Sequence, residues 1–163
     1  MSSASATTEK FDVRNLARAV ELDAGPDGLN VRLTSEQWTV LANYLQPFSV
    51  QSGQILMELG ELDRTLYFVE SGTLSVHCED AKSRIRLALV GAGSVVGEGG
   101  FFSHLARRAT VQASGACVLW RLNPLRFGEL VNRQPAIAVE MLLALGMVQG
   151  RRLRDRGRRI AAT

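Results

Sequence analysis

Residues 48–97 read "FSVQSGQILMELGELDRTLYFVESGTLSVHCEDAKSRIRLALVGAGSVVG". Short runs that are apolar or that alternate apolar with polar residues follow one another here, and glycines or the polar segment EDAKS separate them. Regular short strands with glycine turns are typical of an all-β sandwich or barrel. Two further strands are expected at 110–114 and 116–122, joined by a Ser-Gly turn. The pattern predicts a mainly β protein, a sandwich or barrel of about eight strands with flanking helices.

A helix is expected just before this region. Thr34 can cap the N–H groups near Gln37 in the manner of a capping box, and apolar residues follow at helical spacing. Pro47 then ends the helical pattern. Further upstream, residues 11–22 form a short amphipathic pattern, which the segment DAGPDG interrupts.

The chain is expected to end in two helices. Asn123 can cap the first, at 124–134, with Pro124 at its first position. The second covers 135–154 and carries a nearly continuous apolar stripe. Several of its apolar residues exceed what one face needs to cover the β-roll, so we expect a homodimer through this helix. These residues are Met141, Leu142, Leu145, Val148 and Leu153.

Length and composition predict one soluble domain. The chain has 163 residues, 46% of them hydrophobic and 21% charged, which is ordinary for a globular protein. Residues 1–33 are interpreted as an N-terminal extension, disordered over about the first ten residues, and residues 34–163 as the domain. The formal net charge of +3 comes from an arginine-rich end, residues 151–159. We interpret this end as a solvated helix terminus, which the helix dipole favours.

Targeting and membrane signals are lacking in the sequence. The N-terminus has no signal-peptide pattern, and the longest apolar run, 136–148, is too short to span a bilayer and contains Glu140. Cys78 and Cys117 stand far apart in apolar runs, as reduced core thiols do. We therefore expect a cytoplasmic protein without membrane contact.

Catalytic and metal sites are not indicated either. His77 and His104 have no Cys, Asp or second His at ligand spacing, so no metal site is expected. No nucleophile, base and oxyanion donors occur together. The sequence therefore predicts a binding protein and not an enzyme.

Residues 95–111, "VVGEGGFFSHLARRATV", contain a glycine corner, a single carboxylate and a pair of arginines. Glycines let the backbone approach a ligand closely, and the N–H groups at the start of a helical turn attract an anion. Arg107 would add a charge-assisted contact to phosphate oxygens, and Glu98 can accept hydrogen bonds from sugar hydroxyls. Together these groups are complementary to a ribose phosphate. The alternative is a structural salt bridge between Glu98 and Arg107 across the loop.

The same segment resembles the phosphate-binding cassette of the cyclic-nucleotide-binding domain family. That cassette reads F-G-E-hydrophobic-[ASG]-L, a short loop, then P-R-x-A-[ST]-V. Gly97 and Glu98 fit its start, Arg107 stands at the usual offset of nine residues, and residues 109–111 close the motif. Flanking motifs extend the likeness over residues 34–154.

The resemblance implies the family's fold, an antiparallel β-roll or jelly roll (a cupin-like double-stranded β-helix) of about eight strands with an N-terminal helix and two C-terminal helices. It also implies a cyclic nucleotide as ligand, cAMP or alternatively cGMP, and no metal. The implied ligand-binding residues are Gly97, Glu98, Gly99, Gly100, Phe101, Arg107, Arg108, Ala109 and Thr110. Phe101 would relay binding to the last helices, and a protein effector is a further expected partner.

Four departures from the family pattern lie in or beside the cassette. Gly99 replaces an aliphatic residue, Ala106 a proline, and Arg108 a small residue, while residues 95–96 replace the usual aromatic. For Arg108, a solvated side chain is the preferred interpretation, with contact to base or phosphate as the alternative. The departures leave the fold prediction intact and bear on affinity and base choice.

Three functions remain open at this stage. The first is a cyclic-nucleotide sensor. The second is a stand-alone or truncated relative of a Crp-type transcription regulator. After the last strand about forty residues remain, which two helices consume, so DNA binding is not expected without a further domain. The third is a degenerate domain that has lost its ligand and serves for dimerisation.

Overall fold

The computed structural model describes residues 10–23, 25–79 and 82–155. The expected disorder of about the first ten residues lies almost wholly outside this range, as does residue 156 onward of the arginine-rich end. The N-terminal half contains α1 (Val13–Leu22), α2 (Ser35–Leu41), the 3-10 turn η1 (Ala42–Tyr44), β1 (Gln46–Val50), β2 (Ile55–Met57), β3 (Leu66–Ser71) and β4 (Leu74–Glu79). The C-terminal half contains β5 (Ile85–Val90), β6 (Val95–Val96), α3 (Glu98–Ser103), β7 (Thr110–Ala113), β8 (Cys117–Leu122), α4 (Pro124–Arg133) and α5 (Pro135–Arg154).

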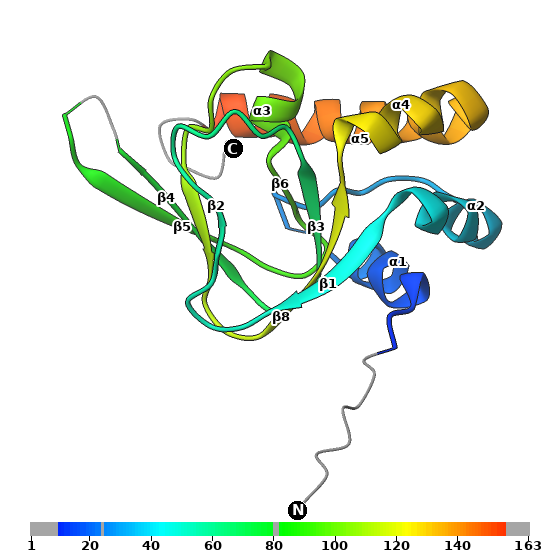
Figure 1. The fold of residues 1–163 in the computed structure, drawn as a ribbon, viewed down its shortest axis with the longest axis horizontal. Helices are drawn as coiled ribbons and strands as arrows, with labels where there is room; N and C mark the ends of the chain where they lie inside the picture. Colours follow the sequence, from blue (N-terminus) through cyan, green and yellow to red (C-terminus); the bar gives the residue numbers. More distant parts are fainter. Residues whose placement is uncertain (1–9, 24, 80–81, 156–163) are drawn as a thin grey trace, which may run out of the picture.

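The eight strands form two antiparallel four-stranded sheets, ordered β1-β8-β3-β6 and β2-β7-β4-β5. This confirms the predicted β-roll with N-terminal helices and two C-terminal helices. In Figure 1 the sheets face each other, the helices lie outside the roll, and the β4–β5 hairpin projects from one side. The glycine corner of the sequence becomes α3, inserted between β6 and β7.

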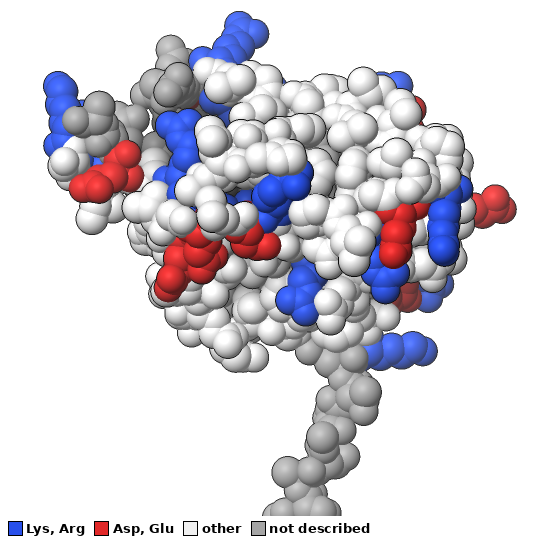
Figure 2. All heavy atoms as spheres, turned by 45° about the horizontal axis from the view of Figure 1, so that its top comes forward, with Lys and Arg blue, Asp and Glu red and all other residues white. Residues whose placement is uncertain are grey.

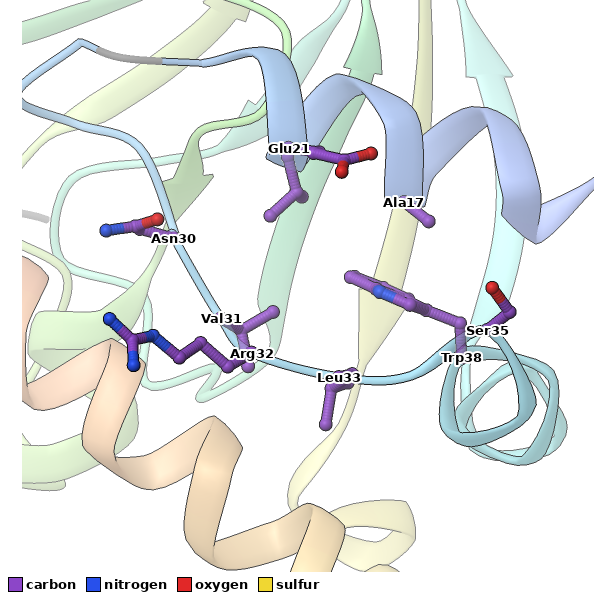
Figure 3. Close-up of a pocket in the computed structure, with 9 residues that line it drawn as sticks. Ala17, Glu21, Asn30, Val31, Arg32, Leu33, Ser35 and Trp38 are labelled. Atoms are coloured by element: carbon purple, nitrogen blue, oxygen red, sulfur yellow. The ribbon is translucent and has the colours of Figure 1, made fainter.

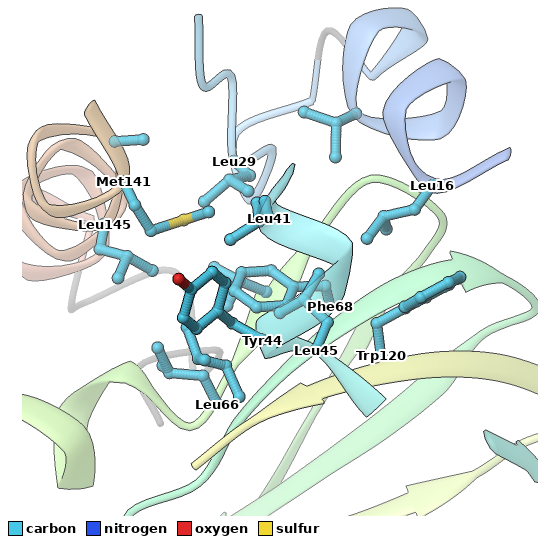
Figure 4. Packing of buried hydrophobic residues seen from close by; sticks show 14 of the residues in the cluster. Leu16, Leu29, Leu41, Tyr44, Leu45, Leu66, Phe68, Trp120, Met141 and Leu145 are labelled. Atoms are coloured by element: carbon cyan, nitrogen blue, oxygen red, sulfur yellow. The ribbon is translucent and has the colours of Figure 1, made fainter. Parts of the chain in front are cut away.

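Strand β3 explains why two separate cores can share one sheet. Its side chains alternate in direction, and both faces are apolar in the run LYFV. Leu66 and Phe68 join the core under the helices, whereas Tyr67 and Val69 join the core inside the roll. Figure 4 shows the first of these cores, in which Met141 and Leu145 of α5 approach the sheet. The helices are thus fastened to the sheet that leads into the cassette.

Capping places the helices where the sequence predicts them. Thr34 accepts a hydrogen bond from the backbone N–H of Gln37, and the Gln37 side chain accepts one from Thr34 N–H, which confirms the capping box. Asn123 caps α4 as expected. The predicted end at Pro47 differs: α2 ends at Leu41, η1 follows, and Pro47 lies in β1. A proline is tolerated there because β1 is an edge strand.

Replacing the capping residue tests this local account. Thr34→Ala leaves N–H groups at the start of α2 without their acceptor, so we expect a loss of about 1 kcal/mol in the free energy of unfolding. Urea denaturation should show a lower midpoint with an unchanged slope. Thr39→Ala is the matched control, because the Thr39 hydroxyl only donates back to Ser35 O inside the helix. An equal loss for both variants contradicts the capping role.

Candidate phosphate-binding cassette

Gly97 begins the cassette in a conformation that favours glycine. Its φ is +94°, in the left-handed region. A Cβ at this position would lie 2.6 Å from the carbonyl oxygen of Thr65 and 2.9 Å from Nη1 of Arg107. Both distances are shorter than the contacts that a Cβ atom makes in proteins. Gly97 therefore lets β6 turn sharply into α3 while the backbone stays against Arg107.

Arg107 is a buried cation that organises the cassette. It is 2% exposed. Its Nη1 donates to the carbonyl oxygen of Gly97 at 2.9 Å, and its Nη2 donates to Thr65 O at 2.7 Å and to Asp63 Oδ2 at 3.0 Å. Its Nε is buried and has no hydrogen-bond partner within residues 10–23, 25–79 and 82–155. The protein thus satisfies two of the three guanidinium nitrogens and leaves the third with an unused donor.

Asp63 is the counter-ion of Arg107. Partial burial acts to raise the pKa of Asp63, but hydrogen bonds from the Thr65 hydroxyl and from Arg107 outweigh it, so the pKa lies below its usual value. Asp63 is therefore ionised at neutral pH and compensates the buried guanidinium. It lies in the turn before β3, 44 residues away from Arg107 in the chain.

Glu98, the other charged residue of the motif, lies with α5. Its side chain is 0% exposed, and Oε2 is 2.6 Å from Nη1 of Arg152. Arg152 also donates from Nε to Asp27 Oδ1 at 3.1 Å and from Nη2 to Val95 O at 2.7 Å. Burial acts to lower the pKa of Arg152, but Glu98 and Asp27 outweigh it and raise the pKa. One guanidinium thus joins the N-terminal loop, the cassette and the last helix.

The alternative interpretation, a salt bridge between Glu98 and Arg107, is not how these side chains pair among the described residues. Between described residues, the recorded ion pairs join Glu98 to Arg152 and Arg107 to Asp63. The reason is that the two side chains lie against different segments of the chain. The Glu98 carboxylate meets the end of α5, whereas the Arg107 guanidinium meets the turn before β3.

The other predicted site residues lie in or next to α3 and the start of β7. Ala109 and Phe101 are buried, and a Cβ at Gly100 would lie 3.0 Å from Nη1 of Arg107. Gly99 lies in the first turn of α3. The Thr110 hydroxyl accepts a hydrogen bond from the backbone N–H of Leu59 and so fastens the end of β2.

Arg108 is exposed, in agreement with the preferred interpretation of a solvated side chain. It follows Arg107 directly, in the bend that precedes β7, and Arg107 beside it is buried. The structure therefore separates the two arginines of the Arg-Arg pair.

The interpretation of the arginine-rich end as solvated is wrong for Arg152. That side chain is 1% exposed, although Arg154 two residues on is exposed. The sequence carried a signal for this: position 152 lies four residues after Val148 and continues the buried stripe of Met141 and Leu145. A charge at the end of that stripe predicts a buried ion pair.

Residues Asp27 and Asp63 had no comparable signal. Each lies in a turn far along the chain from its arginine, and nothing in local spacing links them. Only the closure of the roll brings these carboxylates to the cassette.

Charges on the cassette face are mixed. Figure 2 shows acidic and basic side chains side by side on this face, with uncharged surface around them. A nucleic-acid-binding face carries a coherent basic patch. In this view the basic side chains of the described residues stand beside acidic ones and form no such coherent patch.

A separate hollow of about 340 Å³ lies between α1, α2 and the segment that joins them. In Figure 3 its lining includes Glu21, Arg32 and Trp38, and no cassette residue contributes to it. Within the described ranges, no group of three or more His, Cys, Asp or Glu side chains is placed to hold a metal ion. No helix among the described residues is long and apolar enough to cross a membrane.

Arg152 offers a direct test of the buried network. Arg152→Gln leaves Glu98 and Asp27 without their cation, so we expect a loss of about 3–5 kcal/mol in the free energy of unfolding. Arg154→Gln removes an exposed arginine from the same turn and should change stability by less than about 0.5 kcal/mol. Similar effects of both substitutions in denaturant titrations would refute the buried role.

Known proteins similar to this chain belong to the family that the cassette motif indicates. A family model described as "Cyclic nucleotide-binding domain" matches residues 47–134. A cAMP-dependent protein kinase regulatory subunit from Eremothecium gossypii is 31% identical over 124 residues, 76% of this chain and 26% of that protein. The cAMP-activated global transcriptional regulator CRP of Haemophilus influenzae is 27% identical over 125 residues, 76% of this chain and 53% of that protein. The chain thus spans about a quarter to about half of these relatives.

Solved structures agree on the architecture. A cyclic nucleotide-binding domain from Methylobacillus flagellatus superposes with a TM-score of 0.76, at 20% identity, over 88% of this chain and 79% of that one. Catabolite activator protein of Thermus thermophilus gives a TM-score of 0.68 at 27% identity, over 82% of this chain and 60% of that one. The first likeness supports the fold alone, because its identity is low.

Proposed function

Since the chain belongs to the cyclic nucleotide-binding domain family, we propose that this sensor domain binds a 3',5'-cyclic purine nucleotide, with cAMP as the first candidate. The observation that carries the proposal is the buried guanidinium of Arg107. Its Nε–H has no partner among the residues that the structure describes, and it lies in the segment whose family motif contacts a cyclic phosphate. An unpaired buried donor on a cation is costly unless an anion can meet it.

The remaining roles follow from chemistry. Arg107 and the backbone N–H groups of Gly99 and Gly100 would hold the cyclic phosphate, next to Gly97. Glu98 would accept a bond from a ribose hydroxyl. An ionised carboxylate has about four acceptor sites, so Glu98 can serve Arg152 and a hydroxyl together. Ala109 and Thr110 would shape the wall behind the phosphate, and Arg108 would contact the base or phosphate only at the rim.

Signalling would use Phe101. Its ring is edge-on to that of Phe127 in α4, with centroids 5.0 Å apart and planes at 89°. Movement of α3 on phosphate capture would therefore reach α4 and then α5. A protein effector that reads the position of these helices is the expected partner, with a coupling free energy of about 1–3 kcal/mol.

Calorimetric titration with cAMP, cGMP and a cyclic dinucleotide tests the proposed ligand. Arg107→Ala removes a charged hydrogen bond and should lower the affinity by about ten- to a hundred-fold, or about 1.5–3 kcal/mol. Arg14→Ala is the control, because Arg14 forms an exposed ion pair with Asp12 in α1. Equal affinity of the Arg107 variant and the wild type, or no binding at millimolar nucleotide, would exclude the assignment.

A second candidate function is a dimerisation module without ligand. It is favoured by one observation: Glu98 and Arg107 are almost wholly buried and already hold protein partners. The same titration separates the two candidates, since a degenerate domain would bind none of the three nucleotides.

Dimerisation through α5 is proposed with a changed set of residues. Of the residues expected at the interface, Met141, Leu145 and Val148 belong to the core of the protomer itself, while Leu142 and Leu153 are exposed. The outward stripe of α5 is instead formed by residues four apart that remain exposed, namely Val139, Leu143 and Met147. Gly146 and Gly150 adjoin this stripe, and a Cβ at either would meet nothing within 4 Å. A second copy of the chain could therefore approach α5 closely.

Leu143→Glu places a charge in the centre of this stripe and should convert the dimer to a monomer, because burying an unpaired carboxylate is costly. Light scattering at high micromolar concentration measures the mass. Leu125→Glu, on the exposed side of α4, is the control and should remain dimeric. A wild-type monomer with and without nucleotide, or a dimeric Leu143→Glu, rules out this interface.

A further inference from the structure

Helix α3 is held at both of its ends by arginines from outside the helix. At its start, Arg107 donates to the carbonyl oxygen of Gly97. At its last turn, Nη2 of Arg64 donates to the carbonyl oxygen of Phe101 at 3.1 Å. The last carbonyls of a helix lack intrahelical donors, and a cation there is favoured by the helix dipole. Arg64 therefore acts as a C-terminal cap for the cassette helix.

Arg64 also contacts the ring that faces α4. Its guanidinium carbon lies 6.0 Å from the centroid of the Phe101 ring, within the range of a cation–π contact. Phe101 in turn meets Phe127 edge-on. One side chain thus holds both the carbonyl and the ring of the residue that connects the cassette to α4.

The neighbours of Arg64 bind Arg107. Asp63 accepts from Nη2 of Arg107 through its side chain, and Thr65 accepts from the same nitrogen through its carbonyl. The Thr65 hydroxyl donates to Asp63 Oδ1 at 2.9 Å, which stiffens the tripeptide. Asp63 and Thr65 therefore bind Arg107. Arg64, which lies between them in the chain, binds Phe101.

We propose that Arg64 is a positioning residue that couples Arg107 to the contact between Phe101 and Phe127. This rests on the proposed function, because the anion at Arg107 supplies the displacement. An anion that binds the Nε–H of Arg107 draws the guanidinium toward it, and Asp63 and Thr65, which hold Nη2 of the same group, are drawn with it. A shift of that tripeptide moves Arg64, and with it the far end of α3.

The contact of Arg64 with α3 is weak enough to break when the cassette moves. Among the described residues it makes one hydrogen bond to Phe101 O, and its Nε is buried without a partner. A half-buried arginine with a single hydrogen bond loses little when it changes position, whereas a buried and fully bonded one would hold α3 in place. Arg64 can therefore follow the tripeptide in either direction.

Hydrogen exchange and calorimetry with cAMP as the probe test the proposal. In the wild type, cAMP should protect amides in 97–111 and change exchange in 124–154. Arg64→Gln should still bind cAMP and protect 97–111, but the change in 124–154 should be lost. Arg64→Lys, which keeps a cation able to donate to Phe101 O, should restore it.

The matched control is Arg121→Gln. Arg121 lies over the Phe48 ring at 5.0 Å and bonds Gln46, so its loss removes an arginine–phenylalanine contact of the same kind between β8 and β1, outside the cassette. In this variant, cAMP should change amide exchange in 124–154 as it does in the wild type. Transmission by Arg64→Gln equal to the wild type overturns the proposal. A loss of affinity as large as that of Arg107→Ala also overturns it, because Arg64 would then bind the ligand itself.

Ligand-free protein supplies an arm that does not depend on the proposed function. Without nucleotide, Arg64→Gln should raise amide exchange at the end of α3 and in α4, whereas Arg121→Gln should not. If the wild type binds no cyclic nucleotide, the proposed function fails, and this arm still decides the role of Arg64. Unchanged exchange in α4 would refute the role of Arg64 in either case.

Discussion

The buried guanidinium of Arg107 is the constraint on which the cassette depends. A charge removed from water must find partners, and here they come from the turn before β3 and from the first residue of the cassette. The need to satisfy Arg107 fixes the backbone of Gly97 and excludes a side chain there. The position of α3 therefore follows from the solvation of one cation more than from the helix's own six residues.

A second buried cation, Arg152, likewise joins segments that are far apart in the chain. It meets carboxylates from the N-terminal loop and from the cassette, together with the carbonyl of Val95 in β6. The N-terminal segment, the cassette and α5 consequently share one electrostatic centre. A change at Glu98 would therefore affect both the loop that contains Asp27 and the end of α5, as the proposed signalling by a change of shape requires.

The sequence was informative wherever the cause of a structure is local. Short-strand periodicity, the capping box at Thr34 and the motif from Gly97 to Val111 predicted the fold and the place of the cassette, because each depends on neighbouring residues. The partners of the charged residues were missed, since Asp63 and Asp27 reach the site only when distant segments meet. Arg152 is intermediate: the stripe through Val148 indicated its burial, yet charge at a helix end suggested solvent.

We propose that Arg107 keeps one donor, its Nε–H, for an anionic ligand. Arginine Nε–H signals in nitrogen–proton NMR spectra report hydrogen bonding at that atom, and Arg107→Lys identifies the signal of Arg107. On addition of cAMP, the account predicts a downfield shift of this resonance and slower exchange of its proton with water. An Arg107 signal that stays unchanged at saturating cAMP, while other residues of the cassette respond, would contradict the account.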